Sequence, residues 1–158
     1  MSGELIKVPN TLRNKIGGRM EKVDLKAIAK AEQALEALSS NFDDWIVVEL
    51  TKLGDARKAL PNNDMSGAEG KGLFHHAHDL KGLGTTYGYP IVTAFASSLC
   101  DIIGEAEIRA KAPITLVDAH IDSIRAAIKG SIKVTDHPVG KILSAELAKK
   151  TKQFLATI

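Results

Sequence analysis

The sequence predicts an all-α protein, an antiparallel four-helix bundle with extra N- and C-terminal helices. Three observations lead to this fold class. Ala, Leu, Ile, Lys and Glu dominate the chain, and all of them are compatible with helix. Apolar residues recur at helical spacing, and no segment shows a convincing strand-like alternation. Clusters containing Pro, Gly, Asn or Asp divide the chain into long segments joined by short connections.

The N-terminal part is predicted to hold an arm and a first helix. Residues 1–22 contain a proline and the Gly17–Gly18 pair, which favour an irregular lead-in. Asp24 can cap a helix over about 25–38. The polar run at 39–41 is expected to break this helix or to start the next one.

Four longer helices are expected to follow and to form the bundle. Pro61 opens a clear loop after the first of them. Tyr89–Pro90 interrupts the chain again, because a residue before proline disfavours the helical region. Pro113 opens the last of the four at a favoured first-turn position. The four predicted helices span about 42–60, 69–87, 91–107 and 113–130.

The predicted division of the chain has three parts. Residues 1–22 form the arm, 23–138 form the helical bundle, and 139–158 form a C-terminal helix packed on the bundle. The last helix, over about 140–157, is amphipathic and follows a loop around His137.

Charge and composition argue against nucleic acid and membranes as partners. The formal net charge is only +2, from 21 basic and 19 acidic side chains, and aromatic residues are 4% of the chain. We find neither a signal-peptide pattern nor an apolar run of about 18 residues that could span a bilayer. The single cysteine, Cys100, has no partner for an internal disulfide, which favours a reducing compartment. These features predict a cytoplasmic protein.

The most informative segment is the third predicted helix, which carries three histidines. Its apolar or small stripe faces the core, and His78 lies roughly 140° from Leu73 on that helix. His78 is therefore expected to point to solvent, with Gly82 almost directly beside it one turn on. Lys81 lies roughly 60° away by the same geometry. The stripe consists of Leu73, Ala77, Leu80, Gly84 and Tyr87.

This arrangement suits phosphoryl transfer through an imidazole. Neutral imidazole is a competent nucleophile near physiological pH. Lys81 can offset part of the added negative charge, and Gly82 leaves room for the active-site loop of a partner protein. Helical glycine costs about 0.5–1 kcal/mol relative to alanine. The concentration of Gly82, Gly84 and Gly88 therefore suggests close approach, by a partner at Gly82 and by a neighbouring helix at Gly84 or Gly88.

The run 77–82, Ala-His-Asp-Leu-Lys-Gly, is followed by Gly88 ten residues after the histidine. It resembles the His-x-Leu-Lys-Gly motif of histidine-containing phosphotransfer (HPt) domains, which has a similar later glycine. The resemblance covers roughly residues 40–130. Leu83 departs from it, since the family often has a small residue there, and the arm and the last helix lie outside it.

The resemblance implies an HPt-like bundle in which His78 is the phosphoacceptor, supported by Lys81 and Gly82. The partners would be response-regulator receiver domains and a histidine kinase, and Mg²⁺ would be bound by the receiver only. The protein would be a monomeric phosphotransfer intermediate rather than an ATP-using kinase, with no cofactor or metal of its own. We expect the docking surface around His78 to include Phe74, His75, Asp79 and Thr85.

Three alternatives stay open. The chain could be a non-phosphorylated helical adaptor that binds receiver domains through the same face. It could be a histidine-kinase dimerisation-type domain, although Lys81–Gly82 replaces what should follow the His-Asp pair there. His75, His78 and Asp79 could bind zinc through their i, i+3 and i, i+4 spacings, although a third strong ligand and its support are not evident. Among the other histidines, His76 is expected to be solvated and His120 to be packed or partly buried.

Overall fold

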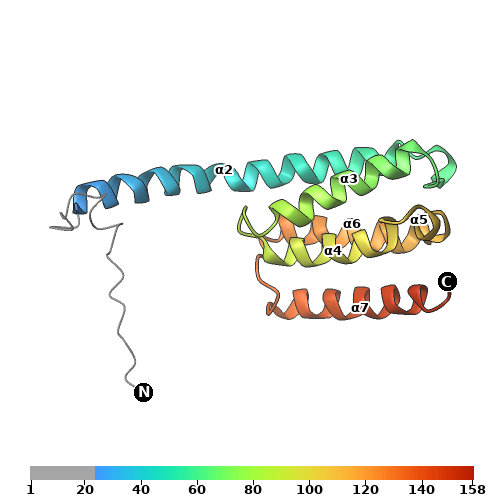
Figure 1. Cartoon of the computed structure of the whole chain (residues 1–158). Helices are drawn as coiled ribbons and strands as arrows, with labels where there is room; N and C mark the ends of the chain where they lie inside the picture. Colours follow the sequence, from blue (N-terminus) through green and yellow to red (C-terminus); the bar gives the residue numbers. More distant parts are fainter. Residues whose placement is uncertain (1–23) are drawn as a thin grey trace, which may run out of the picture. The chain divides into compact units, whose positions relative to one another are not determined.

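Residues 24–158 are described by a computed structural model, and this part of the chain is helical throughout, without strands (Figure 1). The all-α fold class is confirmed. The arm predicted at 1–22 lies outside the described residues. The elements in chain order are α2 (Leu25–Lys58), the 3-10 turn η1 (Pro61–Asn63), α3 (Ala68–Leu83), α4 (Pro90–Ile103), α5 (Ala106–Lys111), α6 (Ile114–Lys129) and α7 (Pro138–Leu155).

By its internal contacts the chain divides into two compact units, Met1–Glu36 and Ala37–Ile158. In the described part of the first unit, Asp24 caps α2 as predicted. Its Oδ1 accepts hydrogen bonds from the backbone N–H groups of Lys26 at 3.0 Å and Ala27 at 3.3 Å. The second unit holds the rest of α2 and every later helix, including α7.

The two helices expected at about 25–38 and 42–60 are a single helix, so the predicted break between them is wrong. The polar side chains that were expected to end the first helix bond back to it. Ser40 Oγ donates to the carbonyl oxygen of Ala37 at 2.7 Å, and Asn41 Nδ2 donates to the same oxygen at 3.3 Å. Because this back-bonding satisfies both side chains within a helix, α2 continues through the polar run.

The centre of the second unit is α4. It packs against α3, α5, α6 and α7, and Figure 1 shows α3 and α7 on opposite sides of it. Removal of its apolar side chains from water supplies the main driving force for this packing. Its buried residues are Ile91, Val92, Phe95, Ala96, Leu99, Cys100, Ile102 and Ile103.

The end of α3 comes at Leu83, earlier than the predicted end at Tyr87. Gly88 adopts φ +83° in the following turn, a left-handed conformation that glycine adopts without strain. The turn closes when the backbone N–H of Tyr89 donates to the carbonyl oxygen of Gly84 at 2.7 Å. Gly88 therefore serves the turn rather than a close helix contact, since nothing lies within 4 Å of a Cβ built there.

A buried arginine explains why α4 ends at Ile103 and does not run on to 107 as predicted. The Arg109 guanidinium donates from Nε to the carbonyl oxygen of Met65 at 3.0 Å. Its Nη1 donates to the carbonyl oxygens of Ile103 at 2.9 Å and Gly104 at 3.1 Å. A cation that satisfies carbonyl groups at the C-terminus of a helix stabilises that end, and α5 then begins as a separate helix.

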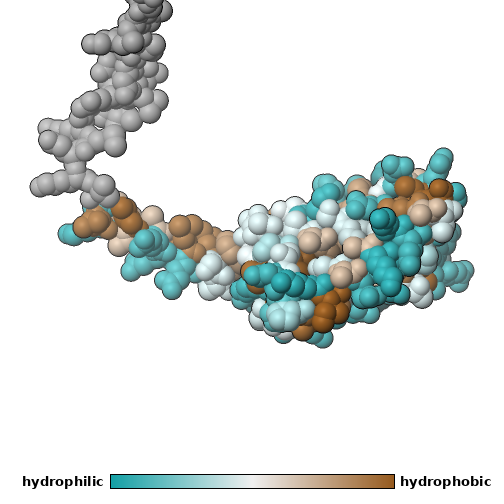
Figure 2. Space-filling model, turned by 90° about the horizontal axis from the view of Figure 1, so that it is seen from below, coloured by the Kyte–Doolittle hydropathy of each residue, from teal (hydrophilic) through white to brown (hydrophobic). Residues whose placement is uncertain are grey.

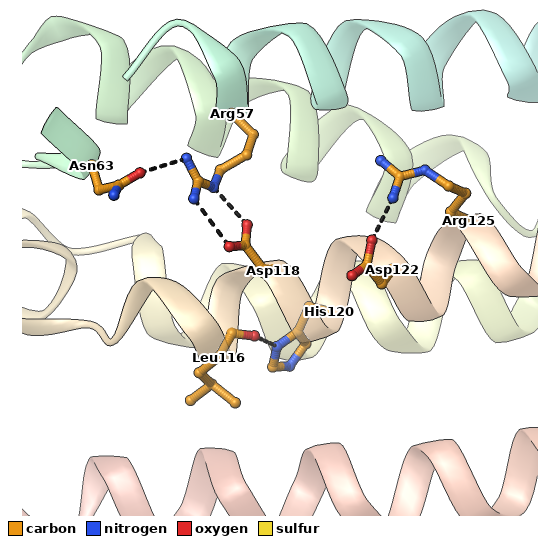
Figure 3. A network of polar contacts seen from close by, with 7 residues as sticks. All are labelled: Arg57, Asn63, Leu116, Asp118, His120, Asp122 and Arg125. Atoms are coloured by element: carbon orange, nitrogen blue, oxygen red, sulfur yellow. Dashed lines mark hydrogen bonds and ion pairs between the residues drawn. The ribbon is translucent and has the colours of Figure 1, made fainter. Parts of the chain in front are cut away.

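An ion pair ties the last turn of α2 to α6 (Figure 3). Arg57 Nε lies 2.6 Å from Asp118 Oδ1, and Arg57 Nη2 lies 3.0 Å from Asp118 Oδ2. The third donor, Arg57 Nη1, reaches Asn63 Oδ1 at 2.9 Å. Such two-point contacts between arginine and a carboxylate fix orientation as well as distance.

A buried polar network joins α4, α6 and α7 around His120, which is fully buried, in agreement with the sequence analysis. Its Nδ1 donates to the carbonyl oxygen of Leu116 at 2.7 Å (Figure 3), so its Nε2 accepts. Ser98 Oγ lies 2.9 Å from Nε2, and Thr151 Oγ1 lies 3.2 Å from Ser98 Oγ. Burial lowers the pKa of His120, against smaller opposing effects of the Leu116 hydrogen bond and Asp101.

This lowered pKa predicts an acid-dependent loss of stability. As the pH falls below about 6.5, the unfolded chain takes up a proton on this histidine before the folded chain does. The free energy of unfolding should therefore fall with pH in this range, by more in the wild type than in His120→Gln. Urea unfolding at several pH values measures both slopes, with the exposed His75, as His75→Gln, for the matched control. Equal slopes for the wild type and His120→Gln would contradict this reading of the network.

Candidate functional site

The direction of His78 is set by the core stripe of α3. Leu73, Ala77 and Leu80 have no exposed surface, as predicted, and Gly84 is buried just beyond the helix. Because three neighbouring turns are held against the core, the opposite side of α3 must face solvent. The imidazole of His78 is exposed, as the spacing from Leu73 predicted.

Gly82, one turn after His78, is exposed and borders open space. A Cβ built at Gly82 would meet no heavy atom within 4 Å. The fold itself therefore does not require glycine at this position, although glycine lowers the stability of a helix. Because Gly82 has no side chain, no atoms of this residue rise beside the His78 imidazole to block the approach of another molecule.

Gly84 has the opposite environment. A Cβ built there would lie 2.6 Å from Thr93 Oγ1 and 2.8 Å from the Thr93 backbone nitrogen on α4. The predicted close approach of a neighbouring helix is confirmed at this glycine. Together, Gly82 and Gly84 show two different reasons for glycine within one helical turn.

On the α4 side of His78 the surface is apolar and basic. The ring of Phe74 is half-buried, and its centroid lies 5.8 Å from the ring centroids of both His75 and His78. Lys81 is exposed, and its charge acts on the buried thiol of Cys100. Burial raises the pKa of Cys100 to about 11, and Lys81 lowers it by a smaller amount. Cys100 is therefore a packed, protonated thiol.

On the α2 side of His78 the surface carries charges of both signs. The side chain of Lys52 lies 2.7 Å from Glu49 Oε1. This hydrogen bond and the Glu49 charge raise the pKa of Lys52, and Asp79 of α3 adds a weaker effect in the same direction. The Asp79 charge therefore acts on Lys52 of α2, an effect that sequence spacing on α3 alone does not reveal.

An aromatic cluster lies further along the same side. The ring centroids of Phe42, Trp45 and Tyr87 lie between 5.5 and 5.9 Å apart. Trp45 is 41% exposed, so it is a surface residue rather than a core one. Together with Val48 and Glu49, Trp45 and Tyr87 line a hollow on this surface. Spacing along α2 places Trp45 and Glu49 on one face, but only the fold brings Tyr87 to them.

Two predicted residues differ from their expected setting. Thr85 is exposed, but it lies in the turn after α3 rather than on the helix. Its hydroxyl lies 2.9 Å from Thr93 Oγ1, and its backbone N–H donates to that oxygen at 2.8 Å.

His76 is half-buried, and its Nδ1 is shielded from solvent without a hydrogen bond, so the expectation of a solvated side chain was wrong. Its position, roughly 160° from His78 on the helix, turns it toward the core. His75, in contrast, is exposed beside His78.

No group of three or more His, Cys, Asp or Glu side chains within residues 24–158 is arranged to hold a metal ion. The His75–His78–Asp79 zinc alternative thus gains no support from this part of the chain. Over the same residues, no helix combines the length and apolar character needed to cross a bilayer.

Comparison of the chain with protein-family models, with curated proteins and with solved structures finds no match.

The different environments of Gly82 and Gly84 predict that alanine at these two positions has opposite effects on the free energy of unfolding. Gly84→Ala should cost about 1–3 kcal/mol, because the new methyl group overlaps Thr93. Gly82→Ala should leave stability unchanged or raise it by about 0.5–1 kcal/mol, since alanine is the better helix former and meets no neighbour. Thermal and urea unfolding of both variants measure the difference. If both substitutions destabilise the protein equally, the environments assigned to these glycines are incorrect.

Proposed function

We propose that this protein is a histidine phosphotransfer protein that shuttles a phosphoryl group between a histidine kinase or its receiver and a response regulator. The observation that carries the proposal is an exposed imidazole, His78, one helical turn from the bare surface of Gly82. An exposed nucleophile beside a position where the fold leaves space suits a reaction whose second reactant is bound to another protein.

The proposed scaffold is an HPt-like four-helix bundle. It consists of the second-unit part of α2 together with α3, α4 and α6, with α7 packed alongside as the extra C-terminal helix. The contacts of α4 with α3, α6 and α7 support it, as does the ion pair between α2 and α6. From α3 to α7 the long helices α3, α4, α6 and α7 alternate in direction in Figure 1, which is typical of such bundles.

In the proposed reaction, the unprotonated ring nitrogen of His78 attacks the phosphorus of an aspartyl phosphate on the receiver. The N–P bond forms as the acyl O–P bond breaks, and the carboxylate leaves on the receiver. The reverse reaction passes the group to the next receiver. Phosphoryl transfer depends mainly on positioning and on neutralisation of charge. The receiver would supply the aspartate and the Mg²⁺, while this chain supplies an accessible nucleophile.

The two sides of the site suit different parts of such a partner. The phosphorylated imidazole would carry a negative charge at a surface that includes the exposed Lys81 ammonium. Phe74 holds an apolar ring beside the imidazole. Across α3, Asp79, Glu49 and Lys52 offer charges of both signs, which favours selection among partners over raw affinity.

The adaptor alternative uses the same surface without chemistry. It predicts no particular need for an accessible imidazole, so the exposure of His78 beside Gly82 favours transfer. The kinase dimerisation alternative requires a different sequence after the His-Asp pair, and here Lys81 and Gly82 stand in that place.

The direct test is phosphotransfer from a panel of phosphorylated receiver domains to the full chain. The wild type should acquire acid-labile, base-stable label, and His78→Gln should acquire none. His137→Gln is the matched control, because it removes an imidazole outside α3 and leaves His78 intact. Undiminished labelling of His78→Gln would overturn the assignment. Receiver binding without any labelling of the wild type would favour the adaptor function.

A second test separates docking space from folding. Gly72 and Gly82 both lie on α3, and a Cβ at either meets nothing within 4 Å. Only Gly82 adjoins His78. Gly82→Leu should therefore slow phosphotransfer by about tenfold or more, whereas Gly72→Leu should change the rate little. Circular dichroism would check that both variants fold. Equal rates for the two leucine variants would show that the surface beside His78 is not where the receiver approaches.

A further inference from the structure

A second exposed histidine lies one helical turn before His78. His75 and His78 are both exposed on α3, and residues three apart on a helix have their Cβ atoms about 5–6 Å apart. Both imidazoles also lie beside the same Phe74 ring, with a distance of 5.8 Å between ring centroids in each case. The two imidazoles therefore share one small patch of the surface of α3.

The side chain of His78 is directed toward the turn that contains His75. In an α-helix the Cα–Cβ bond tilts toward the N-terminus, so a side chain covers the turn before its own Cα. The position of the His78 ring beside Phe74, four residues earlier in the sequence, agrees with this direction. A phosphoryl group on His78 would therefore extend over the turn of His75.

The fold makes no use of the polar atoms of His75. Among residues 24–158, neither His75 nor His78 has a hydrogen-bonding partner. A protonated imidazole carries two N–H donors and one positive charge. Hydrogen bonds between a cationic donor and phosphate oxygens are roughly twice as strong as those between neutral groups. His75 can therefore offer a charged donor at the place that the phosphoryl group would occupy.

We propose that protonated His75 binds the phosphoryl group on His78, so that phosphorylation of this protein becomes more favourable as the pH falls through the range in which imidazole titrates. This inference rests on the proposed phosphotransfer function and assigns its site a second phosphoryl-binding residue. It differs from the role of Lys81, because imidazole, unlike an ammonium group, gains or loses its charge near neutral pH.

Charged groups of both signs surround the two histidines. Lys71 and Asp79 lie one turn before and one turn after His75, and both are exposed. Asp79 is the anion that competes with the phosphoryl group for protonated His75, since residues four apart on a helix are neighbours. A dianionic phosphoryl group nevertheless carries the larger charge. The other charged groups around the patch are Lys81 of α3, Glu49 and Lys52 of α2, and Asp101 and Glu105 at the end of α4.

NMR of the imidazoles in the full chain tests the contact directly. Phosphoramidate, a small phosphoryl donor, should phosphorylate His78 without any receiver. The pH at which His75 is half-protonated should then rise by about half a unit or more, because two negative charges appear within about one helical turn of it. An unchanged titration of His75 in a chain phosphorylated on His78 overturns this inference alone. A chain that takes up no phosphoryl group on His78 from phosphoramidate or from receivers removes the proposed function, and this inference with it.

His137 is the internal control for this titration. It caps the N-terminus of α7, and α7 lies on the opposite side of α4 from α3 (Figure 1). Figure 2 looks onto the side of the molecule that α7 forms, where hydrophilic and hydrophobic residues are intermixed. Because His137 belongs to that side, its titration should not change when His78 is phosphorylated. An equal shift of His75 and His137 would show a general effect of net charge and contradict a local contact.

The phosphotransfer equilibrium tests the functional consequence. The wild type and His75→Gln are each mixed with one phosphorylated receiver at pH 6 and at pH 8, and the equilibrium constant for transfer to His78 is measured. The ratio of the wild-type constant to the His75→Gln constant should be about two- to threefold higher at pH 6 than at pH 8, which is the linked effect of a half-unit shift. His75→Lys should keep the higher constant at both pH values, because its charge does not titrate in this range.

An equilibrium constant separates this role from a docking role of the same residue. It depends only on the free phosphorylated and unphosphorylated proteins, so contacts between His75 and the receiver in the complex do not affect it. If His75→Gln changes the rate of transfer but leaves the ratio of equilibrium constants independent of pH, His75 only shapes the docking surface and the inference is wrong.

Discussion

The packing of α3 against α4 is the constraint on which the candidate site depends. Leu73, Ala77 and Leu80 are completely buried, and Gly84 lets the end of α3 approach Thr93 of α4 closely. These contacts leave α3 one permitted rotation about its axis. A core stripe that fixes one side of a helix also fixes the other, so the exposure of His78 follows from burial of residues that have no chemistry of their own.

The surroundings of His78 then follow from which helix lies on each flank. The α4 flank brings an apolar ring and an ammonium group, from Phe74 and Lys81. The α2 flank brings the Glu49–Lys52 pair, and the Asp79 charge of α3 acts on Lys52. The ion pair between Arg57 and Asp118 helps to hold α2 against α6. A surface with such unlike flanks can orient a protein partner about the exposed imidazole.

The sequence predicts the faces of α3 well, because the spacing of apolar residues along a helix determines which residues share its buried face. It recovered the exposed His78 from spacing, but it left the close approach of a helix open between Gly84 and Gly88, of which only Gly84 has it. It failed where backbone and side-chain hydrogen bonds decide the outcome. Ser40 and Asn41 bond back to Ala37 and leave α2 unbroken. Arg109 donates to three carbonyl groups, and one of them, that of Met65, is far away in the sequence. A local sequence pattern therefore cannot predict this contact. The effect of the Asp79 charge on Lys52 likewise depends on how two helices pack.

The central claim is that one particular imidazole carries the phosphoryl group. Its most direct measurement is localisation of that group on the intact phosphorylated chain, by phosphorus NMR followed by peptide mapping under alkaline conditions that preserve phosphohistidine. The account predicts a single phosphoimidazole resonance and a modification confined to the peptide that contains His78, with His75 and His76 unmodified. A phosphoryl group found on His75, on a carboxylate or on a hydroxyl would contradict it.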